Sequence, residues 1–169
     1  MAEYTGSNTP TNIKDKWQTP LFLFNALNKE FCFKLDVAAS DDNALCHNYF
    51  TEEDSALDNE WDLGAVYCNP PYSDITPWVL KAAEQSQKHG IVVVMLAPAD
   101  QSVGWFKKAL ETVSEVRLIT GGRISFVNAE TKKPVGGNNK GSQLLIWSPF
   151  RQLQVFSTVE KRELERLGG

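Results

Sequence analysis

The fold of this chain is decided by the stretch Val66-Tyr67-Cys68-Asn69-Pro70-Pro71-Tyr72. Its first three residues form a short apolar run that predicts a buried strand, so the last four should follow the carboxyl end of that strand. Open α/β sheets bind their ligands at this end. Both prolines restrict φ and lack an N–H, and a residue before proline is pushed to an extended conformation. We therefore expect a stiff turn at a ligand-binding edge.

The chemistry of this turn suits an exocyclic amino group. Such a nitrogen is a poor nucleophile while its lone pair is delocalised into a ring, and acceptors on its two N–H bonds help to localise that pair. The Asn69 side-chain oxygen is one such acceptor and the Pro70 carbonyl is another. Pro71 adds rigidity, and Tyr72 offers a flat face for an extruded base. A proline-rich turn that merely ends a strand is the alternative interpretation.

The composition indicates one globular domain. The chain has 169 residues, of which 42% are hydrophobic and 22% charged, which is enough for a core and argues against general disorder. The longest apolar run, Ile91 to Ala97, is too short to cross a bilayer. Three cysteines without CxxC spacing indicate reduced thiols of a cytosolic protein, and we expect no metal site: Cys32, Cys46 and Cys68.

Alternating helix and strand patterns predict an α/β sandwich. Helices are expected from Thr19-Pro20 to about Phe31, from Thr76-Pro77 to about Lys88 with Gly90 as the stop, and after Ser102. Strands are expected at 33–37, 46–50, 66–68 and 91–97, the last of them a buried central strand.

The carboxyl-terminal part predicts a different connectivity. Strands at 116–119, 124–127 and 143–147 leave no room for helices between them, which predicts antiparallel strands at the end of a mostly parallel sheet. Ser157 and Glu160 match a capping box that would begin a last helix. The expected organisation is a flexible leader over 1–14, the main domain over 15–156 and a terminal helix over 157–169.

A methyl donor has to bind beside the Asn69 turn if the turn activates an amino group. Asp36 ends a predicted strand and can hold a polar part of a nucleoside, with the small Ala38 allowing close backbone approach. The helix start at Thr19 and Pro20 suits a carboxylate such as that of S-adenosylmethionine. The alternatives are plain helix caps at Asp36 and Thr19.

Two further residues are candidates on the cofactor side. Trp17 can pack on the cofactor, although a tryptophan is often simply part of the core. Asp54 can accept a hydrogen bond from an adenine amino group, although the acidic run Glu52-Glu53-Asp54 is equally well explained as a solvated loop.

The basic loop from Thr131 to Gly141 is the candidate nucleic-acid contact. It is expected to be mobile and to bring several cations near one another, which is what phosphate contacts require: Arg123, Lys132, Lys133 and Lys140. A net charge of −4 argues only weakly against such binding, because one basic face is sufficient. A solvated hairpin loop is the alternative.

Several segments of the chain together resemble the phage DNA N-6-adenine-methyltransferases. They occur in the same order and spacing over roughly Trp17 to Pro149: Trp17-Gln18-Thr19-Pro20, Asp36-Val37-Ala38-Ala39, Asn43-Ala44-Leu45-Cys46, Asn69-Pro70-Pro71-Tyr72, Thr76-Pro77-Trp78 and Gly122-Arg123-Ile124-Ser125-Phe126. The tetrapeptide Asn69-Pro70-Pro71-Tyr72 is shared with many amino-methyltransferases, and its combination with the other segments is more specific.

The resemblance implies a Rossmann-like methyltransferase fold that methylates N6 of adenine in DNA with S-adenosylmethionine. It implies cofactor contacts at Thr19, Pro20, Asp36 and Asn69, and a target adenine held by Asn69 to Tyr72. A separate target-recognition domain is lacking, so the basic loop is the candidate for that role. A phage or prophage origin, the cytoplasm of a bacterial host and a part in restriction–modification are implied too.

Other functions share these residues. An RNA adenine or a protein glutamine amide needs the same two acceptors, and a non-catalytic phage protein that binds DNA or cofactor is a different class. The sequence indicates no membrane association, and it leaves the oligomeric state open.

Overall fold

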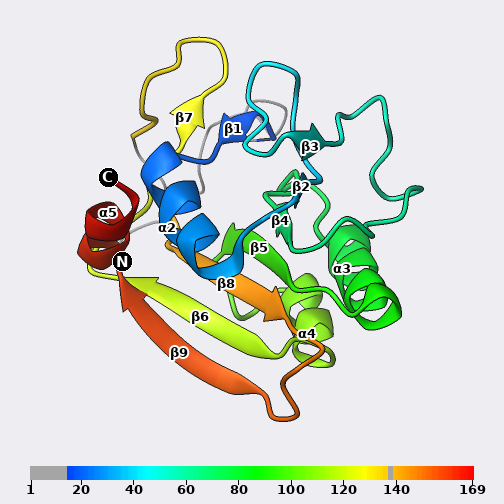
Figure 1. Cartoon of the computed structure of the whole chain (residues 1–169). Helices are drawn as coiled ribbons and strands as arrows, with labels where there is room; N and C mark the ends of the chain where they lie inside the picture. Colours follow the sequence, from blue (N-terminus) through cyan, green and yellow to red (C-terminus); the bar gives the residue numbers. More distant parts are fainter. Residues whose placement is uncertain (1–14, 137–138) are drawn as a thin grey trace.

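The structure is a computed structural model that describes residues 15–136 and 139–169. Its main sheet has seven strands in the order β3-β2-β4-β5-β8-β6-β9 (Figure 1). These strands are β2 (Leu35–Asp36), β3 (Asn48–Tyr49), β4 (Val66–Cys68), β5 (Val93–Pro98), β6 (Glu115–Thr120), β8 (Ser142–Trp147) and β9 (Val155–Glu160). Within this sheet β8 runs antiparallel to both neighbours, and every other pairing is parallel. The mostly parallel α/β fold is confirmed.

Helices cover both faces of the sheet, which makes three layers (Figure 1). They are α2 (Leu21–Phe31), α3 (Thr76–His89), α4 (Gly104–Leu110) and α5 (Lys161–Gly168). The apolar run of β5 is buried on both faces because it lies at the centre of these layers. Among the described residues, none of the helices has the length and apolar content needed to span a membrane.

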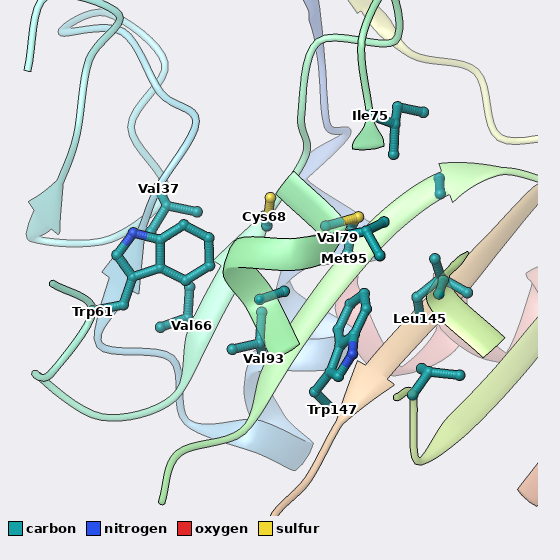
Figure 2. Packing of buried hydrophobic residues seen from close by; sticks show 14 of the residues in the cluster. Val37, Trp61, Val66, Cys68, Ile75, Val79, Val93, Met95, Leu145 and Trp147 are labelled. Atoms are coloured by element: carbon teal, nitrogen blue, oxygen red, sulfur yellow. The ribbon is translucent and has the colours of Figure 1, made fainter. Parts of the chain in front are cut away.

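One half of the core lies between the sheet and the helices α3 and α4. Figure 2 shows this packing, in which Val79 of α3 and side chains of β4, β5 and β8 meet. Trp61 is fully buried in this cluster, and its indole N–H donates to the carbonyl of Ala56 at 2.9 Å. The loop before β4 is thereby attached to the core, which holds β4 in place.

The other half of the core lies under α2 and α5. Tyr67 of β4 packs edge-on against Phe24 of α2, with ring centroids 5.3 Å apart. The amphipathic pattern of α2 explains this contact, because Leu23, Phe24 and Leu27 share one face and are buried. Consecutive residues of β4 thus face opposite halves of the core, and the strand emerges between them at Asn69.

Two predictions for the carboxyl-terminal part are wrong. Residues 124–127 do not form a strand of the main sheet, because only Val127 enters a strand, β7 (Val127–Asn128), which pairs antiparallel with β1 (Trp17–Gln18) in a separate small sheet. The last helix begins at Lys161 rather than Ser157, because 155–160 pair with β6 as an edge strand. Of the expected antiparallel strands, β8 is confirmed, whereas β6 runs parallel to β5.

The expected helix caps also differ in detail. The helices α2 and α4 begin two residues after the predicted caps Thr19 and Ser102, whereas α3 begins at its predicted cap Thr76, and none of the three has a side-chain cap hydrogen bond. Gly90 does end α3 in the left-handed conformation, at φ 63°, where glycine is favoured. The predicted leader over 1–14 lies outside the described residues.

Candidate active site at the carboxyl edge of the sheet

The Asn69 turn follows directly on β4, at the carboxyl edge formed by β2, β4 and β5. Asn69 is half-buried, and its amide nitrogen donates to the backbone carbonyl of Trp17 at 3.2 Å. Because the amide nitrogen is the donor in this bond, the Oδ1 atom of Asn69 faces away from Trp17 and remains available as an acceptor. Pro70 is buried and Pro71 is half-buried, as expected for a turn whose backbone is restricted by ring geometry.

An aromatic group lies beside this turn. Trp17 stacks on Phe126 with centroids 5.8 Å apart, and Tyr72 meets the Phe126 ring edge-on at 6.1 Å. The Tyr72 hydroxyl donates to the carbonyl of Leu96 on β5 at 3.4 Å. Burial raises the pKa of the Tyr72 phenol well above its usual range, so the group remains a neutral donor. The tyrosine ring is therefore held at a fixed position next to Asn69.

The segment before β1 holds the far end of the turn. The carboxylate of Asp15 accepts the backbone N–H of Ser73 at 3.0 Å. One short segment thus contacts the turn at both ends, through the Trp17 carbonyl and the Asp15 side chain. We did not identify Asp15 or Phe126 as site residues from the sequence. Phe126 lies in a segment that carried the resemblance, which was the available signal, and nothing local marks Asp15.

Thr19 and Pro20 lie between the turn and the helix α2. The Thr19 hydroxyl is hydrogen-bonded to the Tyr67 hydroxyl at 2.7 Å, so it does not cap the helix. The Pro20 carbonyl accepts the N–H groups of Leu23 and Phe24. The amides of Leu21 and Phe22 precede these bonds and have no acceptors within the helix, and α2 begins at the same edge as the Asn69 turn.

Asp36 is the buried carboxylate at the end of β2. It is 3% exposed, lies opposite Tyr67 in the register of β2 and β4, and accepts the N–H groups of Ala38 at 3.3 Å and Leu45 at 3.2 Å. Burial raises the pKa of Asp36 to about 6, and the two backbone N–H groups oppose that rise. The described chain has no helix between β2 and β3, so Asp36 is not a helix cap, and its carboxylate instead holds the loop after β2.

Asp54 differs from Asp36 because it is exposed and already engaged nearby. Its Oδ2 accepts the N–H and the hydroxyl of Thr51, each at 2.8 Å. The backbone N–H of Thr51 is the main reason that the pKa of Asp54 is lowered. This arrangement stabilises the turn after β3, and among the described residues no hydrogen bond or ion pair joins Asp54 to the other candidate residues.

The basic segment forms a hairpin around β7, closed by hydrogen bonds from Val135 to Phe126 and from Asn128 to Lys133. Lys132 pairs with Asp42 of the loop after β2 at 2.8 Å, and Lys140 pairs with Asp100 after β5. The three lysines therefore do not form one cluster. Because β4 lies between β2 and β5, Lys132 and Lys140 are anchored on opposite sides of the Asn69 turn.

The other two predicted contacts are exposed. Lys133 lies in the hairpin, and its backbone N–H donates a hydrogen bond to the Thr131 hydroxyl at 3.4 Å. Arg123 lies between β6 and β7, on the connection that leads to Phe126. Gly137 and Asn138 of the predicted loop lie outside the described residues.

The strand order and the helices on both faces are those of the Rossmann-like methyltransferase fold. A solved structure from Pyrococcus horikoshii, described as a candidate RNA methyltransferase, superposes with a TM-score of 0.51 at 15% sequence identity, over 87% of this chain and 93% of the other. At that identity the match shows the fold alone.

Sequence comparison identifies the family. The family DNA N-6-adenine-methyltransferase (Dam) matches residues 6–169. A DNA N-6-adenine-methyltransferase of Haemophilus phage HP1 is 37% identical, over 86% of this chain and 85% of the relative. One from Escherichia phage T1 is 34% identical, over 92% of this chain and 71% of the relative. The chain belongs to the DNA N-6-adenine-methyltransferase family and is a DNA adenine methyltransferase.

Proposed function

We propose that Asn69, Pro70, Pro71 and Tyr72 hold an adenine extruded from DNA while its N6 takes the methyl group of S-adenosylmethionine. The observation that carries this assignment is the hydrogen bond from the Asn69 amide nitrogen to the Trp17 carbonyl. It leaves Oδ1 as a pre-oriented acceptor at the carboxyl edge of β4, which needs no reorganisation when a substrate arrives.

The proposed roles follow from hydrogen-bonding capacity. The Asn69 oxygen accepts one N6–H and the Pro70 carbonyl accepts the other, which localises the nitrogen lone pair. Both oxygens then stabilise the positive charge that develops on nitrogen as it forms its bond to carbon. Tyr72 stacks on the base, with Phe126 packed behind it. After transfer the nitrogen loses a proton to solvent, and no residue is required as a general base.

The residues on the other side of the turn fit S-adenosylmethionine, which supplies an electrophilic methyl group on a sulfonium. Asp36 has the chemistry to accept hydroxyl donors of a nucleoside, and Ala38 beside it is small. The first amides of α2, after Thr19 and Pro20, suit the carboxylate of the donor. Trp17 and Asn69 lie between the residues proposed for the cofactor and those proposed to hold the adenine. Asp54 is the weakest of these assignments, because its carboxylate is engaged by Thr51.

DNA is proposed to lie across the hairpin. Lys132 and Lys140 are anchored on either side of the turn, and with Lys133 and Arg123 they offer cations to phosphates on both sides of an extruded base. Such contacts position the nucleic acid without reading its sequence. Because the two relatives described above are phage proteins, we place the reaction in the cytoplasm of a bacterial host and propose restriction–modification as its context.

The test is methyl transfer from labelled S-adenosylmethionine to unmethylated genomic DNA, followed by nucleoside analysis. We expect the label in N6-methyladenine, and a rate of labelling that is lower by about 10²–10³ with Asn69→Ala. RNA and a glutamine peptide are offered in parallel. Label in either of these but not in DNA would contradict the proposal, and cofactor binding without any transfer would instead support a non-catalytic binder.

A further inference from the structure

The two edges of the main sheet differ in how they are protected. The edge strand β3 has two residues, whereas the edge strand β9 has six and pairs continuously with β6. Natural edge strands avoid self-association through short length, lysine, proline or bulges. Within Val155–Glu160 there is no proline or basic residue, and no described strand pairs with its outer side. The β9 edge therefore lacks the usual protection.

The hydrogen-bonding direction along β9 follows from its ladder with β6. The N–H of Val155 donates to the carbonyl of Ser114 at 2.9 Å, so the backbone groups of Val155 face β6. In a parallel ladder this direction alternates, so Ser157 and Val159 also face β6. The N–H and C=O groups of Phe156 and Thr158 and the N–H of Glu160 consequently point to the open side, where another strand can take them, whereas the Glu160 carbonyl belongs to the first turn of α5.

Large apolar side chains are exposed on β9 and on the connection that precedes it. Phe150 is 78% exposed, Leu153 79%, Phe156 60% and Val155 40%. Because an aromatic side chain has about 150–250 Å² to bury, these four residues offer on the order of 400 Å² per protomer. A standard interface buries about 800 Å² per partner. The four side chains therefore supply roughly half of that area, and the backbone of the edge strand contributes more.

We propose that β9 pairs antiparallel with β9 of a second copy of this chain, with Thr158 opposite Thr158 at the two-fold axis. This register pairs both backbone groups of Thr158 with those of its own copy and places Phe156 opposite Glu160 of the other copy, where the Glu160 N–H can donate to the Phe156 carbonyl. Glu160 is the one charged residue in the strand, and here it does not meet its own copy. The sequence of β9 is therefore compatible with itself, which is what a symmetric interface requires.

This dimer has a consequence for the two active sites. An antiparallel pairing of edge strands joins the two sheets through an axis perpendicular to the sheet. The carboxyl edges of the parallel strands then face in opposite directions, so the sites lie on opposite sides of the dimer. Each site is complete within one copy, and methyl transfer per site does not depend on dimerisation. The inference is independent of the proposed function.

The test is the mass of the full chain in solution, measured by sedimentation equilibrium over a wide range of concentrations. One chain has a mass of 18.9 kDa, and we expect twice that mass at high concentration. Phe156→Glu places two like charges opposite each other and Phe156→Lys places opposite charges there, so the glutamate variant should associate at least about tenfold more weakly than the lysine variant.

Leu80→Glu is the matched control, because Leu80 is 48% exposed on α3, away from β9. It should dimerise like the wild type. Methyl transfer shows that each variant is folded, since the sites do not need the interface. A wild-type chain that stays at the mass of one copy at every concentration would overturn the proposal. Equal association of the two Phe156 variants would overturn this pairing of β9.

Discussion

The Asn69 turn and the basic hairpin lie at the same edge of the sheet but are held in different ways. The turn is held by a buried strand, by ring geometry and by hydrogen bonds to backbone groups, such as the one from Asn69 to the Trp17 carbonyl. Lys132 of the hairpin is held by an ion pair at the surface, where it and its partner Asp42 are 50% and 65% exposed. Exposed pairs of this kind contribute little to stability.

The difference indicates that the turn and the hairpin have different roles in the reaction. Atoms that act on the reacting nitrogen have to be oriented before the substrate binds, because a small displacement is costly. Cations that meet phosphates need only to be near and can exchange one anionic partner for another. We therefore expect changes in the turn to lower turnover strongly and changes in the hairpin to alter affinity and its salt dependence.

The largest effect is expected from Asn69→Ala. Loss of one pre-oriented acceptor should lower kcat by about 10²–10³, with cofactor binding largely retained. Single-turnover methyl transfer and calorimetric titration of S-adenosylmethionine measure the two quantities. Asn69→Asp keeps acceptor oxygens but loses the N–H that donates to the Trp17 carbonyl. This variant therefore distinguishes the acceptor role of the side chain from its orientation by Trp17. Near-normal turnover in the alanine variant would contradict the proposed mechanism.

Tyr72→Ala should have the next largest effect. Stacking on an aromatic side chain is worth about 1–3 kcal/mol per base, so kcat/KM should fall by roughly ten- to a hundredfold. Tyr72→Phe is the control, because it keeps the ring and loses only the long hydrogen bond to Leu96. Equal loss in both variants would show that the hydroxyl rather than the ring is important.

Asp36 predicts a pH dependence on the cofactor side of the turn. Its pKa is raised from 3.8 to about 6 by burial, so the folded state favours the neutral form. The stability contributed by this group is present below pH 3.8 and is lost as pH rises to about 6, by about 3 kcal/mol. Chemical unfolding of the wild type and of Asp36→Asn at several pH values measures this difference.

Cofactor binding should change in the opposite sense. The carboxylate form is the better acceptor for hydroxyl groups of the cofactor, so affinity for S-adenosylmethionine should rise as pH increases through about 6, by up to about tenfold per unit. In Asp36→Asn the affinity should be lower and should not vary over this range. Identical pH profiles for the two proteins would exclude Asp36 from the cofactor site.

The smallest effect on activity is expected from Lys132→Ala combined with Lys133→Ala. Each lost phosphate contact should reduce the slope of log affinity against log salt by about 0.9, while kcat at saturating DNA stays close to normal. Lys107→Ala with Lys108→Ala is the matched control, because both lysines lie on α4. An unchanged salt slope in the hairpin variant would remove the hairpin from the DNA site.

Local signals in the sequence predicted the parts of the fold that depend on few neighbours. The apolar run of β5, the stop of α3 at Gly90 and the strand before Asn69 are all confirmed, because burial, left-handed geometry and proline restriction act over a few residues. Residues 155–160 show the limit of such signals. Their capping-box pattern predicted a helix, but pairing with β6 forms a strand there, and β6 is distant in sequence.

The same distinction holds for the site. The sequence by itself determined that a stiff Asn-Pro-Pro-Tyr turn follows a buried strand, because proline geometry and apolar patterning are local properties. Only the tertiary structure decided that the Trp17 carbonyl orients the Asn69 amide, that Phe126 packs against Tyr72 and that Lys132 and Lys140 are anchored apart. Those contacts join residues far apart in the chain, and no local preference specifies them until the sheet brings its carboxyl edge together.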